Sequence, residues 1–106
     1  MKRPTILTLA LTVAAGLAAG AALAQTYNTV PAGDAQYAQC KTWSSSRYTG
    51  GTEASPVGGQ TKVDAFCTCM WNETPDNFKG NLAAFAETGA GAAMNKTCEK
   101  YSGWES

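Results

Sequence analysis

Four cysteines in a short chain constrain this sequence more than any other feature. They are Cys40, Cys67, Cys69 and Cys98, in a protein of 106 residues. An even number of cysteines in a small chain is typical of a disulfide framework formed in an oxidising compartment. A bridge that closes a loop of about 30 residues stabilises the folded state by about 3–4 kcal/mol. We therefore expect two disulfides to supply a large share of the stability.

Residues 1–24 follow the three-part plan of a secretory signal peptide. A basic start precedes an apolar run over residues 6–23, and the small-residue motif Ala22-Leu23-Ala24 ends it. The run is close to the length of about 18 residues at which a spanning helix begins. Its many glycines and alanines make it only weakly hydrophobic, however. We predict cleavage before Gln25, a periplasmic or secreted location, and no membrane span in the mature chain.

Charge and composition limit the classes of function that this chain can have. Without Lys2 and Arg3, six of the eight basic residues remain against eight acidic ones, a net charge of −2. This balance argues against nucleic acid or an anionic membrane as the partner, because both require a basic patch. The sequence contains no histidine, the commonest general base. We predict a protein that is not an enzyme and has no cofactor.

The mature chain has the patterns of an all-α protein. Residues 25–33 are expected to be a flexible N-terminal lead-in, and residues 34–106 a single small domain. Asp34 is a suitable cap for a helix that runs to about Ser46. Residues 47–59 contain four glycines and a proline, which predicts a long loop.

Three further helices follow from spacing and capping signals. Between residues 60 and 72, apolar positions recur at i, i+3, i+4 and i+7, which is one buried face of a helix. Thr74 and Pro75 are typical of a helix start, and the last helix is expected over residues 92–101. The predicted fold is a disulfide-stapled bundle of about four short helices.

The spacing of Cys67 and Cys69 indicates how they pair. On a helix, positions i and i+2 point about 200° apart, so each cysteine should reach a different neighbouring helix. This disfavours a Cys67–Cys69 bond. Between the two remaining pairings we favour Cys40–Cys69 with Cys67–Cys98, because Cys67 and Cys98 both lie on apolar stripes.

A strand would give the same cysteines another role. Positions i and i+2 share one face of a strand, so Cys67 and Cys69, with Met70 beside them, could bind copper or act as a redox pair. Zinc sites and redox motifs use wider spacings such as C-x-x-C. Structural disulfides are therefore the preferred interpretation, and the copper or redox site is the alternative.

Large amphipathic rings are frequent in this chain. Their simplest role is to cover the disulfides and fill a thin core. Tyr48 and Trp104 lie at loop or terminal positions where burial is harder to arrange, so we predict that these two bind a partner. The five rings are Trp43, Tyr48, Trp71, Tyr101 and Trp104.

Two functional hypotheses follow. The first is a non-enzymatic module, secreted or periplasmic, that binds another protein through the loop at residues 47–59 and the aromatics near it. An accessory subunit of a larger enzyme is a variant of this hypothesis. The second is a thiol-based copper-binding or redox protein that uses Cys67 and Cys69.

Overall fold

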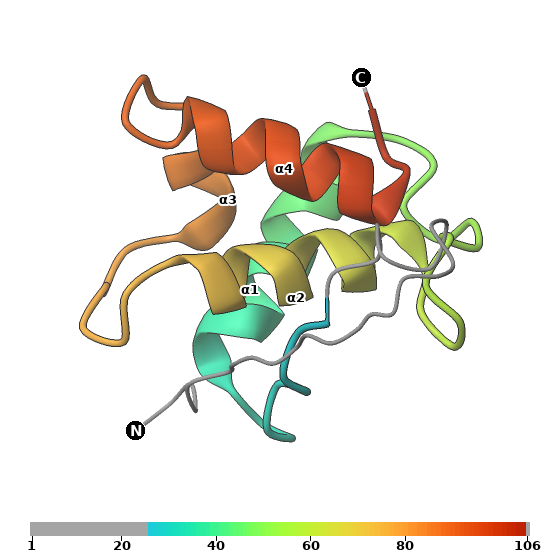
Figure 1. Cartoon of the computed structure of the whole chain (residues 1–106), viewed down its shortest axis with the longest axis horizontal. Helices are drawn as coiled ribbons and strands as arrows, with labels where there is room; N and C mark the ends of the chain where they lie inside the picture. The colour runs from blue at the N-terminus through green and yellow to red at the C-terminus, as the bar shows by residue number, and fades with distance from the viewer. Residues whose placement is uncertain (1–25, 106) are drawn as a thin grey trace, which may run out of the picture.

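The computed structural model describes residues 26–105 of the chain. Within these residues the fold consists of helices and loops, with no strand and one isolated bridge between Ala54 and Thr61. The predicted all-α bundle of four short helices is confirmed (Figure 1). The helices are α1 (Ala35–Arg47), α2 (Lys62–Glu73), α3 (Leu82–Ala86) and α4 (Ala92–Ser102).

Side-chain caps define the starts of α1 and α2. The Asp34 carboxylate accepts a hydrogen bond of 2.9 Å from the Tyr37 N–H, so Asp34 caps α1 as predicted. Thr61 and Asp64 form a reciprocal capping box at the start of α2, where the Thr61 hydroxyl accepts from the Asp64 N–H at 3.2 Å. Both helices begin close to their predicted positions because these signals are local.

Thr74 corrects one prediction, because it ends α2 instead of beginning a helix with Pro75. The Thr74 N–H donates to the Met70 carbonyl at 3.1 Å, and its hydroxyl donates to the same carbonyl at 3.0 Å. The chain then turns through residues 75–81, and Asn81 caps the start of α3. A threonine hydroxyl can accept from backbone N–H groups or donate to backbone carbonyls, so its presence alone does not distinguish a helix start from a helix end.

Helix α2 lies at the centre of the bundle. Its residues Val63 and 65–71 are buried, so the helix is covered on all sides and not along one stripe. Helix α4 runs beside α2 in the opposite direction, and α1 packs against α2 as well (Figure 1). This arrangement places α2 between the two helices that carry the other cysteines.

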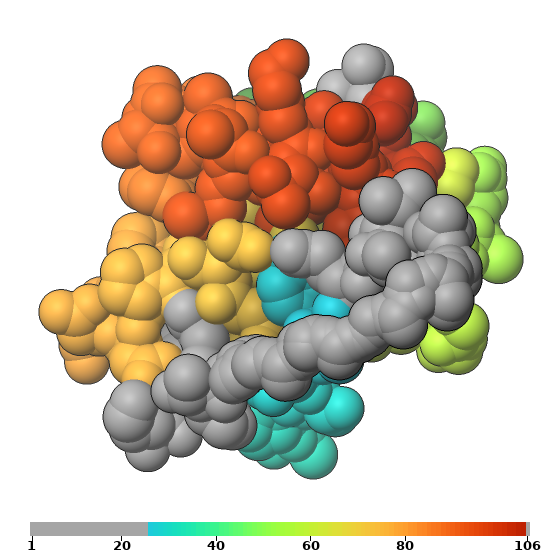
Figure 2. All heavy atoms as spheres, in the orientation of Figure 1, coloured from blue at the N-terminus to red at the C-terminus, as the bar shows by residue number. Residues whose placement is uncertain are grey.

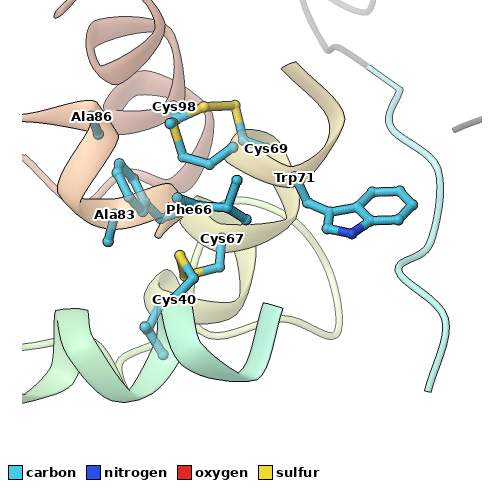
Figure 3. Close-up of a cluster of buried hydrophobic side chains, with 11 residues drawn as sticks. Cys40, Phe66, Cys67, Cys69, Trp71, Ala83, Ala86 and Cys98 are labelled. Atoms are coloured by element: carbon cyan, nitrogen blue, oxygen red, sulfur yellow. A yellow bond between two sulfur atoms is a disulfide. The ribbon is translucent and has the colours of Figure 1, made fainter. Parts of the chain in front are cut away.

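Two disulfides join α2 to its neighbours (Figure 3). Cys40 of α1 is bonded to Cys67, and Cys69 is bonded to Cys98 of α4. All four cysteines are fully buried. The expectation that each cysteine of the Cys-x-Cys motif reaches a different helix is confirmed.

The particular pairing that the apolar stripes favoured is wrong. Cys40 pairs with Cys67 and not with Cys69, and Cys98 pairs with Cys69 and not with Cys67. The stripe argument assumed that α2 buries a single face. Because α2 is covered all round, both of its cysteines lie in the core, and the positions of α1 and α4 decide which sulfur each helix reaches.

Residues 26–33 also differ from expectation, since they dock on the helices instead of forming a free lead-in. The Asn28 N–H donates to Asn72 Oδ1 and Asn72 Nδ2 donates to the Asn28 carbonyl, both at 3.0 Å. The Tyr27 ring packs edge-on against Tyr101 of α4, with 4.8 Å between ring centroids. The segment therefore bridges α2 and α4.

The predicted signal peptide at residues 1–24, together with Gln25, lies outside the described residues. In the part of the chain that is described, no helix has the length and apolar character needed to cross a membrane. Two disulfides are typical of proteins that fold outside the reducing cytoplasm.

Candidate functional site

A pocket of about 80 Å³ lies where the end of α4 meets the end of α1 and the loop at residues 48–61. This loop projects at the right-hand edge of the molecule in Figure 2, next to the end of α4. All four helices supply side chains to the wall, which sets the pocket apart from two more open depressions that fewer helices line. The lining residues are Trp43, Ser44, Tyr48, Phe66, Ala83, Ala86, Glu87, Asn95, Glu99 and Trp104.

Trp104 closes one side of the pocket because α4 ends sharply just before it. Gly103 adopts the left-handed conformation that favours glycine, with φ of 72°, and its N–H donates to the Glu99 carbonyl at 2.8 Å. The Ser102 hydroxyl accepts from the Trp104 N–H at 3.1 Å. Trp104 Nε1 then donates to the Thr49 carbonyl at 2.7 Å. These bonds hold the indole against the loop.

Glycine at position 51 allows the loop to approach the indole closely. A Cβ on Gly51 would lie 3.1 Å from Trp104 Cη2 and 3.0 Å from Val63 Cβ, closer than ordinary packing permits. The Trp104 ring packs edge-on against both Tyr48 and Phe66, with 6.2 Å between ring centroids in each pair. Such edge-to-face pairs are favourable, so the three rings hold one another in place.

Phe66 reaches the pocket from the central helix. Figure 3 shows that its side chain points from α2 toward Ala83 and Ala86 of α3. The small alanine side chains leave the ring room on that side. Phe66 is therefore shared between the core and the pocket wall.

A balanced group of charges lies at the junction of α1 and α3. The Tyr48 hydroxyl donates to the Glu87 carboxylate, and Arg47 Nη2 lies 3.6 Å from Glu87 Oε1. The hydrogen bond to Glu87 raises the pKa of the Tyr48 phenol, and the Arg47 charge opposes that rise. The Arg47 guanidinium also lies 4.4 Å from the centroid of the Trp43 ring. Arg47 thus neutralises Glu87 while it contacts an aromatic face.

Helix α4 adds a second carboxylate, Glu99. Asn95 precedes it by one helical turn, and Asn95 Nδ2 donates to Glu99 Oε2 at 3.2 Å. Among residues 26–105, no lysine or arginine nitrogen lies within 4.0 Å of the Glu99 carboxylate. With Arg47 matched to Glu87, the pocket region carries one surplus negative charge.

The structure brings the two predicted partner-binding residues, Tyr48 and Trp104, into this one pocket. Tyr48 is 40% exposed, and Trp104 is partly buried. Sequence reasoning missed Glu87 and Glu99 because scattered carboxylates have the pattern of ordinary solvated positions. The one local signal was the four-residue spacing of Asn95 and Glu99, which places both on one helix face.

The alternative site at Cys67, Cys69 and Met70 lies in the core and does not line the pocket. The segment is a helix instead of the strand that this alternative required, and the two sulfurs are bonded to different helices. In the described part of the chain, no three histidine, cysteine, aspartate or glutamate residues gather closely enough to hold a metal ion.

Comparison of the chain with protein-family models, with curated proteins and with solved structures finds no match. The function proposed below therefore rests on the geometry and chemistry of the pocket.

Proposed function

We propose that this protein is a non-enzymatic module, periplasmic or secreted, that binds another protein through the pocket and the loop beside it. The observation that carries the proposal is the exposed Tyr48 ring packed against Trp104 at a pocket that all four helices help to form. Tyrosine and tryptophan are the preferred anchors of protein interfaces, because they bury a large area and also offer a polar atom.

Preorganisation of the rings supports a binding role. Association costs less when the contacting side chains are already fixed before the partner arrives. Trp104 is held by its hydrogen bond to Thr49 and by its close contact with Gly51, and Tyr48 is held by Glu87. The disulfides anchor the helices that carry these residues. An accessory subunit of a larger enzyme would use the same surface for a permanent contact.

Site-specific photo-crosslinking in the cells that produce the protein tests this proposal. A benzoylphenylalanine at the exposed position 49 lies next to the lining residue Tyr48, and its carbonyl accepts from the lining residue Trp104. The substitution leaves every lining side chain in place. Position 77 is the matched control. It lies in the exposed turn that packs near the start of α1, whereas the pocket lining begins at Trp43, about 10 Å farther along that helix, and extends to Tyr48 at its end.

We expect position 49 to give a defined crosslinked protein and position 77 to give none. The crosslink at position 49 should be lost in a Trp104→Ala variant. Crosslinked chains recovered from the non-cytoplasmic fraction should begin at Gln25 if the signal peptide is cleaved as predicted. Equal yields of the same product at positions 49 and 77, or no product at position 49, would contradict a binding role for this surface.

A further inference from the structure

The pocket has room for one side chain and not for a larger element. A buried water molecule needs roughly 10–15 Å³ of cavity volume, so a pocket of about 80 Å³ holds several water molecules. Sites for drug-sized molecules are larger, at roughly 300–1,000 Å³, and a helix is about 10 Å across. The volume therefore suits the few heavy atoms of one long side chain that enters from a docked surface.

The charges of the pocket favour a cation as its occupant. Glu87 already has Arg47 as an ion-pair partner at 3.6 Å. Among residues 26–105, the Glu99 carboxylate has only Asn95 as a hydrogen-bond partner, and no cation lies within ion-pair distance of it. Covering the Glu99 carboxylate with an apolar group would remove its water without replacing that interaction, which is unfavourable. A single positive charge would balance the surplus.

The aromatic walls favour the same kind of occupant. Trp43, Tyr48, Phe66 and Trp104 all line the pocket, and the faces of such rings attract cations. The chain itself shows this pairing at the edge of the pocket, where the Arg47 guanidinium lies 4.4 Å from the Trp43 ring centroid. A planar guanidinium can stack on a ring and bind a carboxylate through two parallel hydrogen bonds, which an ammonium cannot do.

Building on the proposed binding function, we infer that the pocket receives one arginine side chain of the partner protein. Its guanidinium pairs with the Glu99 carboxylate, which Asn95 holds in position, and its apolar stem lies along the rings of Tyr48 and Trp104. The partner surface accordingly presents a protruding arginine, flanked by residues that contact the loop at residues 48–61.

Titration with short peptides tests this inference without the natural partner. The probes are acetyl-Gly-Arg-Gly-amide and the same peptide with citrulline, which has the shape of arginine and no charge. The readout is the NMR signal of the Trp104 indole N–H, which donates to the Thr49 carbonyl beside the pocket. We expect the arginine peptide to bind with Kd on the order of 1 mM and at least about tenfold more tightly than the citrulline peptide.

Two matched charge variants connect the preference to the pocket. Glu99→Gln removes the surplus carboxylate and should weaken arginine-peptide binding by about fivefold or more. Glu105→Gln removes an exposed carboxylate that does not line the pocket, and should leave the affinity unchanged. Both variants should retain the wild-type NMR signals of the core residues, which shows that they fold.

Equal affinity for the arginine and citrulline peptides, or equal loss in both variants, would overturn the inference. Tighter binding of tetramethylammonium than of the arginine peptide would also overturn it, because the occupant would then be a small-molecule cation. Any of these three results leaves the proposed binding function intact if the crosslink at position 49 is still obtained. Loss of that crosslink with the arginine preference preserved would contradict the function instead.

Discussion

At the scale of single residues, Tyr27 shows how one side chain joins the N-terminal segment to the helices. Its hydroxyl donates to the Glu73 carboxylate and lies 3.4 Å from Cys69 Sγ, while its ring contacts Tyr101. Burial raises the pKa of Tyr27 well above its ordinary value, and the hydrogen bond to Glu73 raises it further. The folded protein therefore holds Tyr27 as a neutral phenol.

The Tyr27→Phe substitution should change how stability depends on alkaline pH. With a raised folded pKa, the unfolded chain loses the phenol proton first, at about pH 10. The contribution of Tyr27 is therefore complete below about pH 10 and is lost as the pH rises further. Tyr27→Phe should cost about 1.5–3 kcal/mol near neutral pH, where it removes a hydrogen bond to the Glu73 carboxylate. From pH 9 to 11 its stability should fall less steeply than that of the wild type.

Urea denaturation at each pH measures both effects. The wild type and Tyr27→Phe retain Tyr48 and Tyr101, whose pKa values are also raised, so the comparison isolates Tyr27. Parallel stability curves for the two proteins up to pH 11 would show that Tyr27 does not ionise differently in the folded and unfolded states.

Trp71 shows that the sequence could predict the burial of an aromatic residue but not its hydrogen-bond partner. Trp71 is fully buried, in agreement with the core role expected for most of the rings, and Figure 3 shows its indole pointing toward the N-terminal segment. Its Nε1 donates to Asp34 Oδ2 at 3.2 Å. The side chain that caps α1 thus also satisfies a core tryptophan, a contact over 37 residues of sequence that no local pattern indicated.

At the scale of the elements, the close approach of α3 and α4 depends on Gly91. Gly91 is buried at the start of α4, and a Cβ at this position would lie only 2.1 Å from the Phe85 carbonyl oxygen. Because this contact is with backbone, no side-chain rotation can relieve it. Gly89, two residues earlier, is exposed and would place a Cβ in open space.

Alanine at these two glycines should have very different effects. Gly91→Ala should force α3 and α4 apart and destabilise the protein by about 1–3 kcal/mol or more. Gly89→Ala should stay within about 0.5 kcal/mol of the wild type. Urea denaturation of the two variants gives the comparison, and a Gly91→Ala protein as stable as Gly89→Ala would mean that the helices are not in close contact there.

At the scale of the whole molecule, the disulfides hold the outer helices to α2. The bridges close loops with sequence separations of 27 and 29 residues. Each is expected to stabilise the fold by about 3–4 kcal/mol, a large share of the roughly 5–15 kcal/mol that a small domain has in total. Removal of one bridge should leave a weakened fold, and removal of both should leave the chain largely unfolded.

Partial reduction of the purified protein tests the pairing. Trypsin leaves Cys67 and Cys69 in one peptide, residues 63–79, so ordinary mapping cannot separate the two pairings. Opening one bridge in acid, labelling the new thiols, and then reducing and labelling the rest resolves them by fragmentation of the labelled peptides. We expect the first label on Cys40 with Cys67, or on Cys69 with Cys98. First labels on Cys40 and Cys69 together would contradict the structure.

Local chemistry in the sequence determined the elements of this fold. Asp34, the pattern at residues 60–72 and Gly103 act within a turn or two of their own position, so the predicted helices match α1, α2 and α4 closely. The opposite directions of Cys67 and Cys69 likewise follow from helix geometry alone. Thr74 failed as a signal because its hydroxyl can serve either end of a helix.

Tertiary packing decided the rest, because those features depend on where the helices lie around α2. The sequence identified Tyr48 and Trp104 as candidates, but only the fold places them in one pocket with Glu99. It also decides which sulfur faces α1 and which faces α4, and so the disulfide pairing. A central helix buried on every side has no single apolar stripe, so its sequence specifies that it is buried but not which neighbour covers which face.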